Sequence, residues 1–232
     1  MSDPFSVQGR IVCVTGASSG IGRFLASTLV SAGASVVGVA RRKDQLDAWA
    51  EEAGAAGGQA ATVSGDLSTP EGLEGIADAV KGPFGDPEIL VNAAGVNPRA
   101  AADDLTLEVW RATIDLNLTT PFFLARCLVP AMKARAWGRI INIASMQSFR
   151  AMSNGLAYGA SKGGIVQLTR AMAEAWSRDG ITCNALGPGF FPTELTEKVY
   201  RDATLLKQLA GQTCIGRNGE LDDLVGPALF LA

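Results

Sequence analysis

Short apolar runs alternate with amphipathic stretches from one end of the chain to the other. Apolar residues at successive positions are typical of strands buried on both faces, and a helical spacing of apolar residues between them predicts helices. We expect strands at Ile11–Val14, Ser35–Ala40, Ala60–Ser64, Ile89–Asn92, Arg139–Ala144 and Ile181–Leu186. The alternation predicts an α/β fold, in which a doubly wound parallel β-sheet is flanked by helices on both faces. Ligands of such sheets bind beyond the carboxyl ends of the strands.

Length and composition narrow the class of protein. The 232 residues, with 47% hydrophobic content, suit a single domain (residues 1–232) with a full-sized core. The net charge of −3, with both signs intermixed, argues against nucleic acid as the main partner. No apolar run approaches the length of a membrane span, and the N-terminus lacks the layout of a signal peptide. We therefore expect a cytoplasmic protein with no membrane partner.

The chain contains four cysteines and no histidine. The cysteines lie far apart, form no metal-type pair and are expected to be free thiols. The absence of histidine excludes Ser-His-Asp hydrolysis and most zinc chemistry, and we expect no metal. Any general acid or base must then be a tyrosine, lysine, cysteine or carboxylate.

A glycine-rich turn follows the first strand. Three glycines are spaced Gly-x3-Gly-x-Gly, and a helix predicted at Ile21–Ala32 begins among them. A tight turn from strand to helix aims backbone N–H groups and the positive helix end at one point, which suits a pyrophosphate. An ordinary Gly/Ser turn is the alternative. The predicted dinucleotide contacts of the turn are Gly16, Ser18, Ser19, Gly20, Ile21 and Gly22.

Two arginines, Arg41 and Arg42, follow the second strand. An acidic residue at this point binds the ribose 2′-hydroxyl of NAD, whereas arginine accommodates the 2′-phosphate of NADP. No Asp or Glu occurs from Pro4 to Lys43. The sequence therefore favours NADP as cofactor, with NAD as the second choice. The alternative is that both cations are simply solvated loop residues.

Residues after three further strands complete the predicted dinucleotide site. Asp66 is placed to meet the adenine, although it could also cap a turn. The small residues of Asn92–Gly95 would let a flat ring lie against the backbone, unless they merely form a tight turn. Thr193 could hydrogen-bond an amide or cap the next helix. The predicted contacts are Asp66, Leu67, Asn92, Ala93, Ala94, Gly95, Pro188, Gly189, Phe191 and Thr193.

The stretch Leu107–Arg135 has a helical pattern but contains Pro121 and Pro130. A proline lacks the N–H that would bond the carbonyl four residues earlier in a helix. Pro121 thus leaves the carbonyl of Asn117 without its helical partner. We expect a bent helix in which this oxygen is free to bind another group.

A serine and a Tyr-x3-Lys pair are the candidate catalytic groups. Ser145 stands at the carboxyl end of the fifth strand, and Tyr158 and Lys162 lie four apart on a helix predicted from Ser153 to Arg178. A neighbouring ammonium favours the phenolate and lowers the pKa of a tyrosine from its usual value of about 10. The spacing alone occurs by chance on helices. Together with Ser145 and the glycine turn, it predicts proton transfer to or from a substrate.

These residues occur in the order found in the short-chain dehydrogenase/reductase family of the classical type, which the chain resembles over nearly its whole length. The resemblance rests on Thr15-Gly16-x3-Gly20-x-Gly22, Asp66, Asn92–Gly95, Asn117, Ser145, Tyr158-x3-Lys162 and Pro188-Gly189-x3-Thr193. It implies a Rossmann-type fold and a proton relay at Tyr158, with Lys162 binding the nicotinamide ribose. It further implies that Ser145 binds the substrate carbonyl and Asn117 a water of the relay.

Two departures from the family pattern stand out. Ala93 replaces the second asparagine of Asn-Asn-Ala-Gly. The family's final strand, which completes the sheet and contributes to the subunit interface, is missing after Ala232. The resemblance implies a homodimer or homotetramer.

Substrate recognition is predicted from two arginines and a glutamine on the ligand side. Arg99 and Arg150 follow strand ends, where they suit a carboxylate or polyol, and Gln147 stands close after Ser145. The stretches 96–99 and 142–146 resemble the sugar-acid branch of the family, which includes gluconate 5-dehydrogenases. We therefore expect an NADP-preferring oxidoreductase that interconverts a secondary alcohol and a ketone by hydride transfer, on a sugar acid, polyol or other small carbonyl compound.

Two alternatives stay open at this point. One is a 3-ketoacyl-carrier-protein-type reductase, whose acidic partner protein could dock on Lys133, Arg135 and Arg178. These cations also fall near helix ends, where the helix dipole alone accounts for them. The other is a redox sensor that binds the dinucleotide without turnover, against which the presence of Ser145 and Tyr158 speaks.

Overall fold

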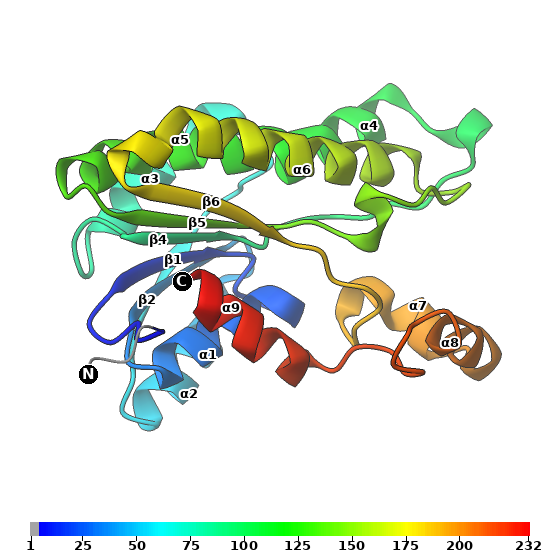
Figure 1. Cartoon of the computed structure of the whole chain (residues 1–232), viewed down its shortest axis with the longest axis horizontal. Coiled ribbons are helices and arrows are strands. Elements are labelled where there is room, and N and C mark those ends of the chain that lie inside the picture. Colours follow the sequence, from blue (N-terminus) through cyan, green and yellow to red (C-terminus); the bar gives the residue numbers. More distant parts are fainter. Residues whose placement is uncertain (1–4) are drawn as a thin grey trace.

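Six parallel strands form the central sheet of the computed structural model, which describes residues 5–232 (Figure 1). The strands are β1 (Ile11–Thr15), β2 (Ser35–Ala40), β3 (Gln59–Ser64), β4 (Ile89–Asn92), β5 (Gly138–Ile143) and β6 (Ile181–Leu186). Their order in the sheet is β3-β2-β1-β4-β5-β6, and each neighbouring pair is parallel. The predicted Rossmann-type, doubly wound α/β fold is confirmed.

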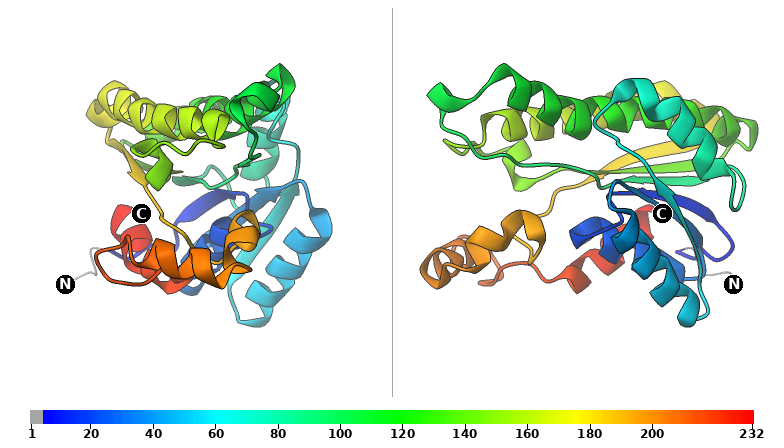
Figure 2. Two further views of the ribbon diagram at one scale, coloured as in Figure 1. Left: turned by 90° about the vertical axis from the view of Figure 1, so that its right-hand side faces the viewer. Right: turned by 180° about the vertical axis from the view of Figure 1, so that it is seen from behind.

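Helices cover both faces of this sheet (Figures 1 and 2). One face carries α1 (Gly20–Ser31), α2 (Lys43–Ala55) and α9 (Val225–Leu231). The other carries α3 (Leu73–Lys81), α4 (Leu107–Ile114), α5 (Thr120–Ala134) and α6 (Leu156–Trp176). The short helices α7 (Glu197–Tyr200) and α8 (Ala203–Ala210) extend to the right of the sheet in Figure 1. They belong to the connection between β6 and α9.

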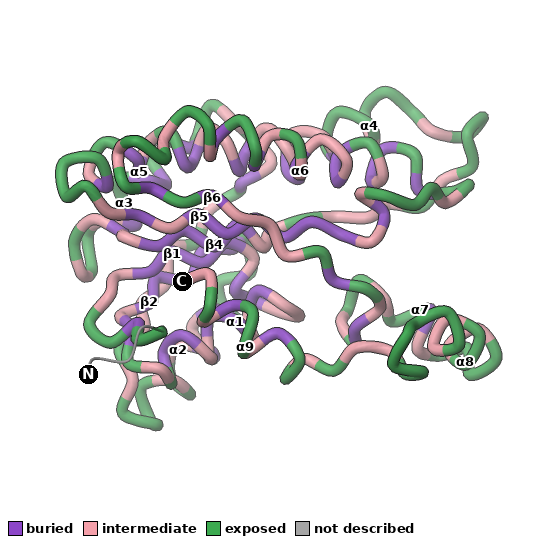
Figure 3. The backbone as a smooth tube through the Cα atoms, viewed as in Figure 1, coloured by how far each residue is buried: buried purple, intermediate pink, exposed green. Residues whose placement is uncertain are grey.

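The core lies between the sheet and each helical layer, so the four inner strands β2, β1, β4 and β5 are buried along most of their length (Figure 3). Neighbouring residues of one strand face opposite layers: Val36 packs in the cluster under α1 and α2, and Val37 in the cluster on the other face. Trp49 of α2 is 1% exposed and donates from Nε1 to Ser27 Oγ at 3.1 Å. A Cβ at Gly38 would lie 2.7 Å from the Trp49 ring, so the absence of a side chain there lets the ring pack on β2.

The stretch Leu107–Arg135, where a bent helix was predicted, is helical, and a π-helical segment at Asp115–Thr119 joins α4 to α5. Thr120 N–H bonds the carbonyl of Asp115, five residues back instead of four. Pro121 has no N–H with which to continue an α-helical ladder here, and the wider turn precedes it. Pro130, by contrast, is accommodated inside α5.

The order in which the chain adds strands to the sheet reverses between β1 and β4. From β1 it proceeds outward through β2 to β3, and from β4 outward the other way to β6. Thr15, at the end of β1, accepts hydrogen bonds at Oγ1 from the backbone N–H groups of Ala93 (3.0 Å) and Ala94 (3.1 Å). This contact fixes the loops after β1 and β4 against each other at the point where such sheets bind ligands.

The four cysteines, Cys13, Cys127, Cys183 and Cys214, are free thiols. No helix within residues 5–232 combines the length and the apolar character that crossing a bilayer requires. Over the same residues, no group of three or more His, Cys, Asp or Glu side chains could hold a metal ion.

Candidate functional site

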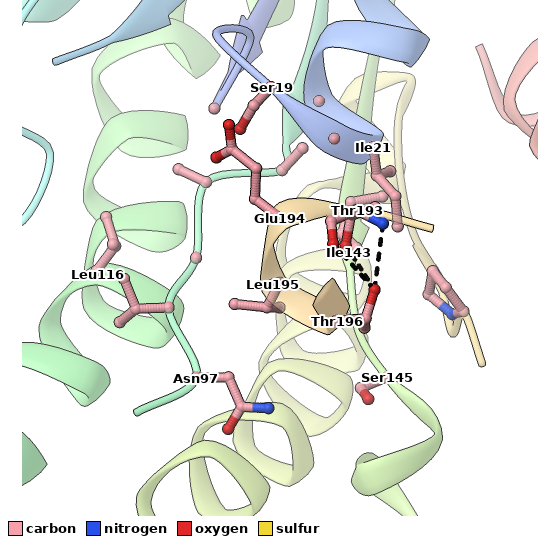
Figure 4. A pocket seen from close by; sticks show the side chains of 18 of the residues that line it. Ser19, Ile21, Asn97, Leu116, Ile143, Ser145, Thr193, Glu194, Leu195 and Thr196 are labelled. Atoms are coloured by element: carbon pink, nitrogen blue, oxygen red, sulfur yellow. Dashed lines mark hydrogen bonds between the residues drawn. The ribbon is translucent and has the colours of Figure 1, made fainter. Parts of the chain in front are cut away.

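A cavity of about 510 Å³ opens at the carboxyl ends of the strands, and Figure 4 looks into it. Loops that follow all six strands, together with residues of α6, contribute to its wall. The predicted site residues that line it are Gly16, Ser18, Ser19, Gly20, Ile21, Gly22, Arg41, Arg42, Asp66, Leu67, Ala93, Ala94, Gly95, Arg99, Ser145, Gln147, Tyr158, Lys162, Pro188, Gly189, Phe191 and Thr193. Asn92, Asn117 and Arg150 are not in this wall.

The glycine turn is shaped first by the protein's own backbone. Gly16 has φ +71°, and a Cβ there would lie 2.8 Å from the backbone nitrogen of Ala94. A Cβ at Gly22 would lie 2.3 Å from the carbonyl oxygen of Gly16. Side chains at either position would therefore push the turn apart before any ligand is considered. A Cβ at Gly20, where φ is +55°, would instead lie 3.3 Å from Thr193 Cβ.

The start of α1 fits an anionic group. Ser19 is the N-cap residue, but its side chain makes no capping hydrogen bond, and the first turn contains no acidic residue. The free N–H groups and the positive end of the helix dipole therefore remain available at the cavity wall. The close-packed glycines and this uncapped helix end are what a dinucleotide pyrophosphate needs.

The two arginines after β2 take different positions. Arg42 donates from Nη2 to Ser19 Oγ (2.6 Å) and Ser18 Oγ (3.1 Å) in the glycine turn. Its Nη1 forms an ion pair with Glu194, at 2.9 Å. Arg41 is exposed, lines the cavity and lies close enough to Asp66 to lower the pKa of that carboxyl slightly. A positive patch therefore stands where the 2′-phosphate of NADP was predicted.

Asp66 and Asn92 both make hydrogen bonds within the protein. Asp66 Oδ1 accepts from the backbone N–H (2.9 Å) and the hydroxyl (2.7 Å) of Ser68, and these bonds lower the pKa of Asp66. The turn-capping alternative thus holds for a residue that also lines the cavity. Asn92 is buried and donates to Asn142 Oδ1 at 2.9 Å, which joins β4 to β5 behind the cavity wall.

Ser145, Tyr158 and Lys162 converge at one end of the cavity. Tyr158 and Lys162 are 7% and 5% exposed, and the Tyr158 hydroxyl lies near enough to the Ser145 side chain for Ser145 to lower the Tyr158 pKa. Ser145 Oγ also accepts from the backbone N–H of Gln147 at 3.1 Å, which holds its side chain in place. Lys162 Nζ donates to the carbonyl of Ile143 at 2.5 Å and lies 5.7 Å from the centroid of the Tyr158 ring.

Burial dominates the electrostatics of this group. It raises the pKa of Tyr158, while the Ser145 side chain and the charge of Arg99 act in the opposite direction. Burial also lowers the pKa of Lys162 to about 8. The expectation that Lys162 sets a lowered tyrosine pKa therefore does not describe this structure. The groups that favour the phenolate here are Ser145 and Arg99.

Asn117 lies in the π-helical segment, 1% exposed, behind the cavity wall. Its Nδ2 donates to Val96 O (2.9 Å) and Ser161 Oγ (3.0 Å), and its Oδ1 accepts from Val96 N–H (2.9 Å). The side chain thus ties the loop after β4 to α6, beside Lys162. The predicted role of the Asn117 carbonyl in binding a relay water stays a prediction.

The substrate candidates separate into two groups. Arg99 and Gln147 line the cavity, and Gln147 is buried with an Oε1 that has no hydrogen-bond partner within residues 5–232. Asn97 Oδ1, also in the wall, is in the same state. Arg150 is exposed outside the wall, where Nη2 donates to Gln212 Oε1 at 3.5 Å.

Several residues of the wall were not foreseen from the sequence. The segment after Thr193 contributes three of them, because it folds back over the cavity mouth (Figure 4). Thr193 itself forms a capping box with Thr196, so its helix-capping alternative holds as well. In the sequence, the signal that identified wall residues was their position just after a predicted strand end. After the sixth strand, this signal identified residues as far as Thr193 and none beyond it. The unforeseen residues are Ala40, Gly65, Val96, Asn97, Leu116, Ile143, Ala144, Met146, Phe190, Glu194, Leu195 and Thr196.

Comparison with known proteins gives a consistent result. Residues 10–204 match the family model described as short chain dehydrogenase. Gluconate 5-dehydrogenase of Gluconobacter oxydans is 36% identical over 231 residues, which cover 99% of this chain and 90% of the relative. D-threitol dehydrogenase of Mycolicibacterium smegmatis is 32% identical, covering 98% and 87%. A solved gluconate 5-dehydrogenase from Burkholderia cenocepacia, in complex with NADP and tartrate, is 36% identical with a TM-score of 0.94, covering 99% and 90%.

Proposed function

The chain belongs to the short-chain dehydrogenase family, and from this premise we propose that it interconverts a secondary alcohol and a ketone of a sugar acid or polyol. It is an NAD(P)-dependent oxidoreductase that acts on CH–OH groups. One observation carries the proposal: a single cavity has the glycine turn and Arg41 in one part of its wall and Ser145, Tyr158 and Lys162 in another. NADP is the preferred cofactor and NAD the second choice.

The residues of the cavity suggest how the reaction proceeds. The bound nicotinamide nucleotide supplies or accepts the hydride at the substrate carbon. Ser145 donates a hydrogen bond to the substrate oxygen and orients it. Tyr158, which lies beside Ser145, gives its proton to that oxygen in the direction of reduction and takes it back in oxidation. In a site this buried, the fixed ammonium of Lys162 is poorly screened, and we assign it to the nicotinamide ribose.

The names of the relatives support a sugar acid or polyol, and the wall of the cavity suits one. Arg99 offers a cation for a carboxylate, and the unpaired amide oxygens of Asn97 and Gln147 accept from hydroxyl groups. The carrier-protein alternative has less support. Lys133 and Arg135 are paired with Asp179 (2.7 Å) and Asp86 (3.6 Å), at the edge of the sheet opposite the cavity.

We also propose that the chain is one dinucleotide-binding domain that works in the cytoplasm as a homodimer or homotetramer, without nucleic-acid or membrane partners. The exposed apolar side chains of Leu107 (61%) and Trp110 (38%) on α4 favour contact with a second copy. Free cysteines suit a reducing compartment, and the net charge of −3 gives nucleic acid no attraction.

The proposed substrate class is tested by following NADPH oxidation with keto-gluconates, small diketones and acetoacetyl thioesters. We expect the highest kcat/KM with a keto-gluconate, because only this substrate has both a carboxylate for Arg99 and several hydroxyl groups. A thioester as the best substrate would favour the carrier-protein alternative. No turnover with any ketone would favour the redox sensor. Arg99→Ala should lower kcat/KM for the keto-gluconate and change that for the small diketones much less. Arg150→Ala is the matched control, because Arg150 lies outside the cavity wall.

Cofactor preference is tested by Arg41→Ala. A charge-assisted hydrogen bond to phosphate contributes about 1.5–3 kcal/mol, so the KM for NADP should rise about tenfold or more while that for NAD changes little. Lys43→Ala serves as control, because it removes a nearby cation whose ammonium is already paired with Asp47. Equal effects of Arg41→Ala on both cofactors would show that Arg41 is only a surface residue.

A further inference from the structure

The guanidinium of Arg42 is fully engaged within the protein. Nε and Nη2 donate to Ser18 Oγ at 3.3 and 3.1 Å, and Nη2 also donates to Ser19 Oγ at 2.6 Å. Nη1 donates to both carboxylate oxygens of Glu194, at 3.2 and 2.9 Å. Each nitrogen of the group therefore has an internal acceptor. A further anion can use Arg42 only by displacing one of them.

Glu194 is the acceptor that can leave. The serines belong to the close-packed glycine turn, whereas the Glu194 side chain is 60% exposed and extends from the segment that follows Thr193. Figure 4 shows its carboxylate reaching toward Ser19 across the cavity mouth. The segment is held against the turn, since a Cβ at Gly20 would lie 3.3 Å from Thr193 Cβ. The carboxylate is thus kept beside the cations that follow β2.

An acidic group at this place has opposite consequences for the two cofactors. The 2′-phosphate of NADP is an anion that pairs best with a free guanidinium edge, and a carboxylate on that edge both occupies it and repels the phosphate. NAD carries a neutral 2′-hydroxyl and loses little. We propose that Glu194 is a cofactor-selectivity residue, whose carboxylate competes with the 2′-phosphate for Arg42 and so limits the preference for NADP.

This inference rests on the proposed use of NADP, and binding measurements test it without turnover. NADPH and NADH are titrated by fluorescence into the wild type, Glu194→Gln and Glu197→Gln. Glu197 lies three residues further on and pairs with Arg201, so its substitution makes the same charge change away from Arg42. Because the ion pair between Arg42 and Glu194 is exposed, it competes only modestly with the binding of the 2′-phosphate. Removing the repulsion between the carboxylate and the phosphate adds to the gain in NADPH affinity. We expect Glu194→Gln to tighten NADPH binding about three- to tenfold and to leave NADH within about twofold, and Glu197→Gln to change neither.

A second arm asks whether the effect passes through Arg42. In an Arg42→Gln background, Glu194→Gln should give no further gain for NADPH, because the contested cation is gone. A gain that persists there, or equal gains with Glu197→Gln, would overturn the competition. Equal changes for NADPH and NADH would show that Glu194 affects the binding of either dinucleotide and not that of the 2′-phosphate. This result would also overturn the proposed competition. The proposed function is tested separately, by measurements on the wild type alone. It fails if the wild type binds NADPH no better than NADH, or if it reduces no ketone.

Discussion

Tyr158→Phe is expected to lower kcat by about 10²–10⁴-fold, the usual contribution of a positioned acid or base, while NADPH still binds. The chain has no histidine to take over the proton, and the Tyr158 hydroxyl is the acidic group beside Ser145 at the end of the cavity. Phenylalanine keeps the ring and its packing. Steady-state rates together with fluorescence titration of NADPH separate loss of chemistry from loss of binding.

The second tyrosine of the chain provides the matched control. Tyr200 lies on α7 and donates from its hydroxyl to the carbonyl of Phe190 at 3.2 Å, outside the group around Ser145. Tyr200→Phe should therefore retain activity close to that of the wild type. Substantial turnover by Tyr158→Phe at neutral pH would show that another group transfers the proton.

Lys162→Met is expected to change the pH dependence of stability. Burial lowers the pKa of Lys162 to about 8 in the folded chain, against about 10.4 for an unfolded lysine. Between these values the unfolded chain holds a proton that the folded chain has lost, so raising the pH stabilises the folded wild type. The gain is about 1.4 kcal/mol per pH unit, or about 2 kcal/mol from pH 8 to 9.5.

The measurement is the difference in unfolding free energy between wild type and Lys162→Met, from urea titrations at several pH values. Using a difference matters, because burial raises the pKa of the Cys13 and Cys183 thiols to about 12, and these groups destabilise the folded state as the pH rises. Their contribution is common to both proteins and cancels. Lys207→Met, at an exposed lysine, should show no such trend. A difference that stays flat from pH 8 to 9.5 would mean that the ammonium is not desolvated.

The sequence predicted the framework of the fold well, because the signals involved are local. The strands Ser35–Ala40, Ile89–Asn92 and Ile181–Leu186 have the predicted bounds, and the others differ by one residue at one or both ends. Buried parallel strands read as continuous apolar runs, and their carboxyl ends mark the binding edge. Most predicted site residues therefore line one cavity.

What sequence could not reveal depends on distance and environment. The ion pair between Arg42 and Glu194 joins residues that are 152 positions apart, so no local sequence pattern predicts it. The direction of the Tyr158 pKa shift follows from burial, which the Tyr-x3-Lys spacing does not encode. Likewise, the glycine spacing suggested room for phosphate, but the clash at Gly22 is with the chain's own backbone.

The π-helical segment Asp115–Thr119 also bears on how this protein can diverge. Its turn is closed by a bond that spans five residues, one more than in an α-helix. Deleting one residue between α4 and α5 would therefore restore a regular α-helical turn and leave the outer parts of both helices in phase. The same deletion would carry Asn117 away from its bonds to Val96 and Ser161. A related chain can thus lose the extra residue and keep the helix pair, but it then loses the contacts of Asn117.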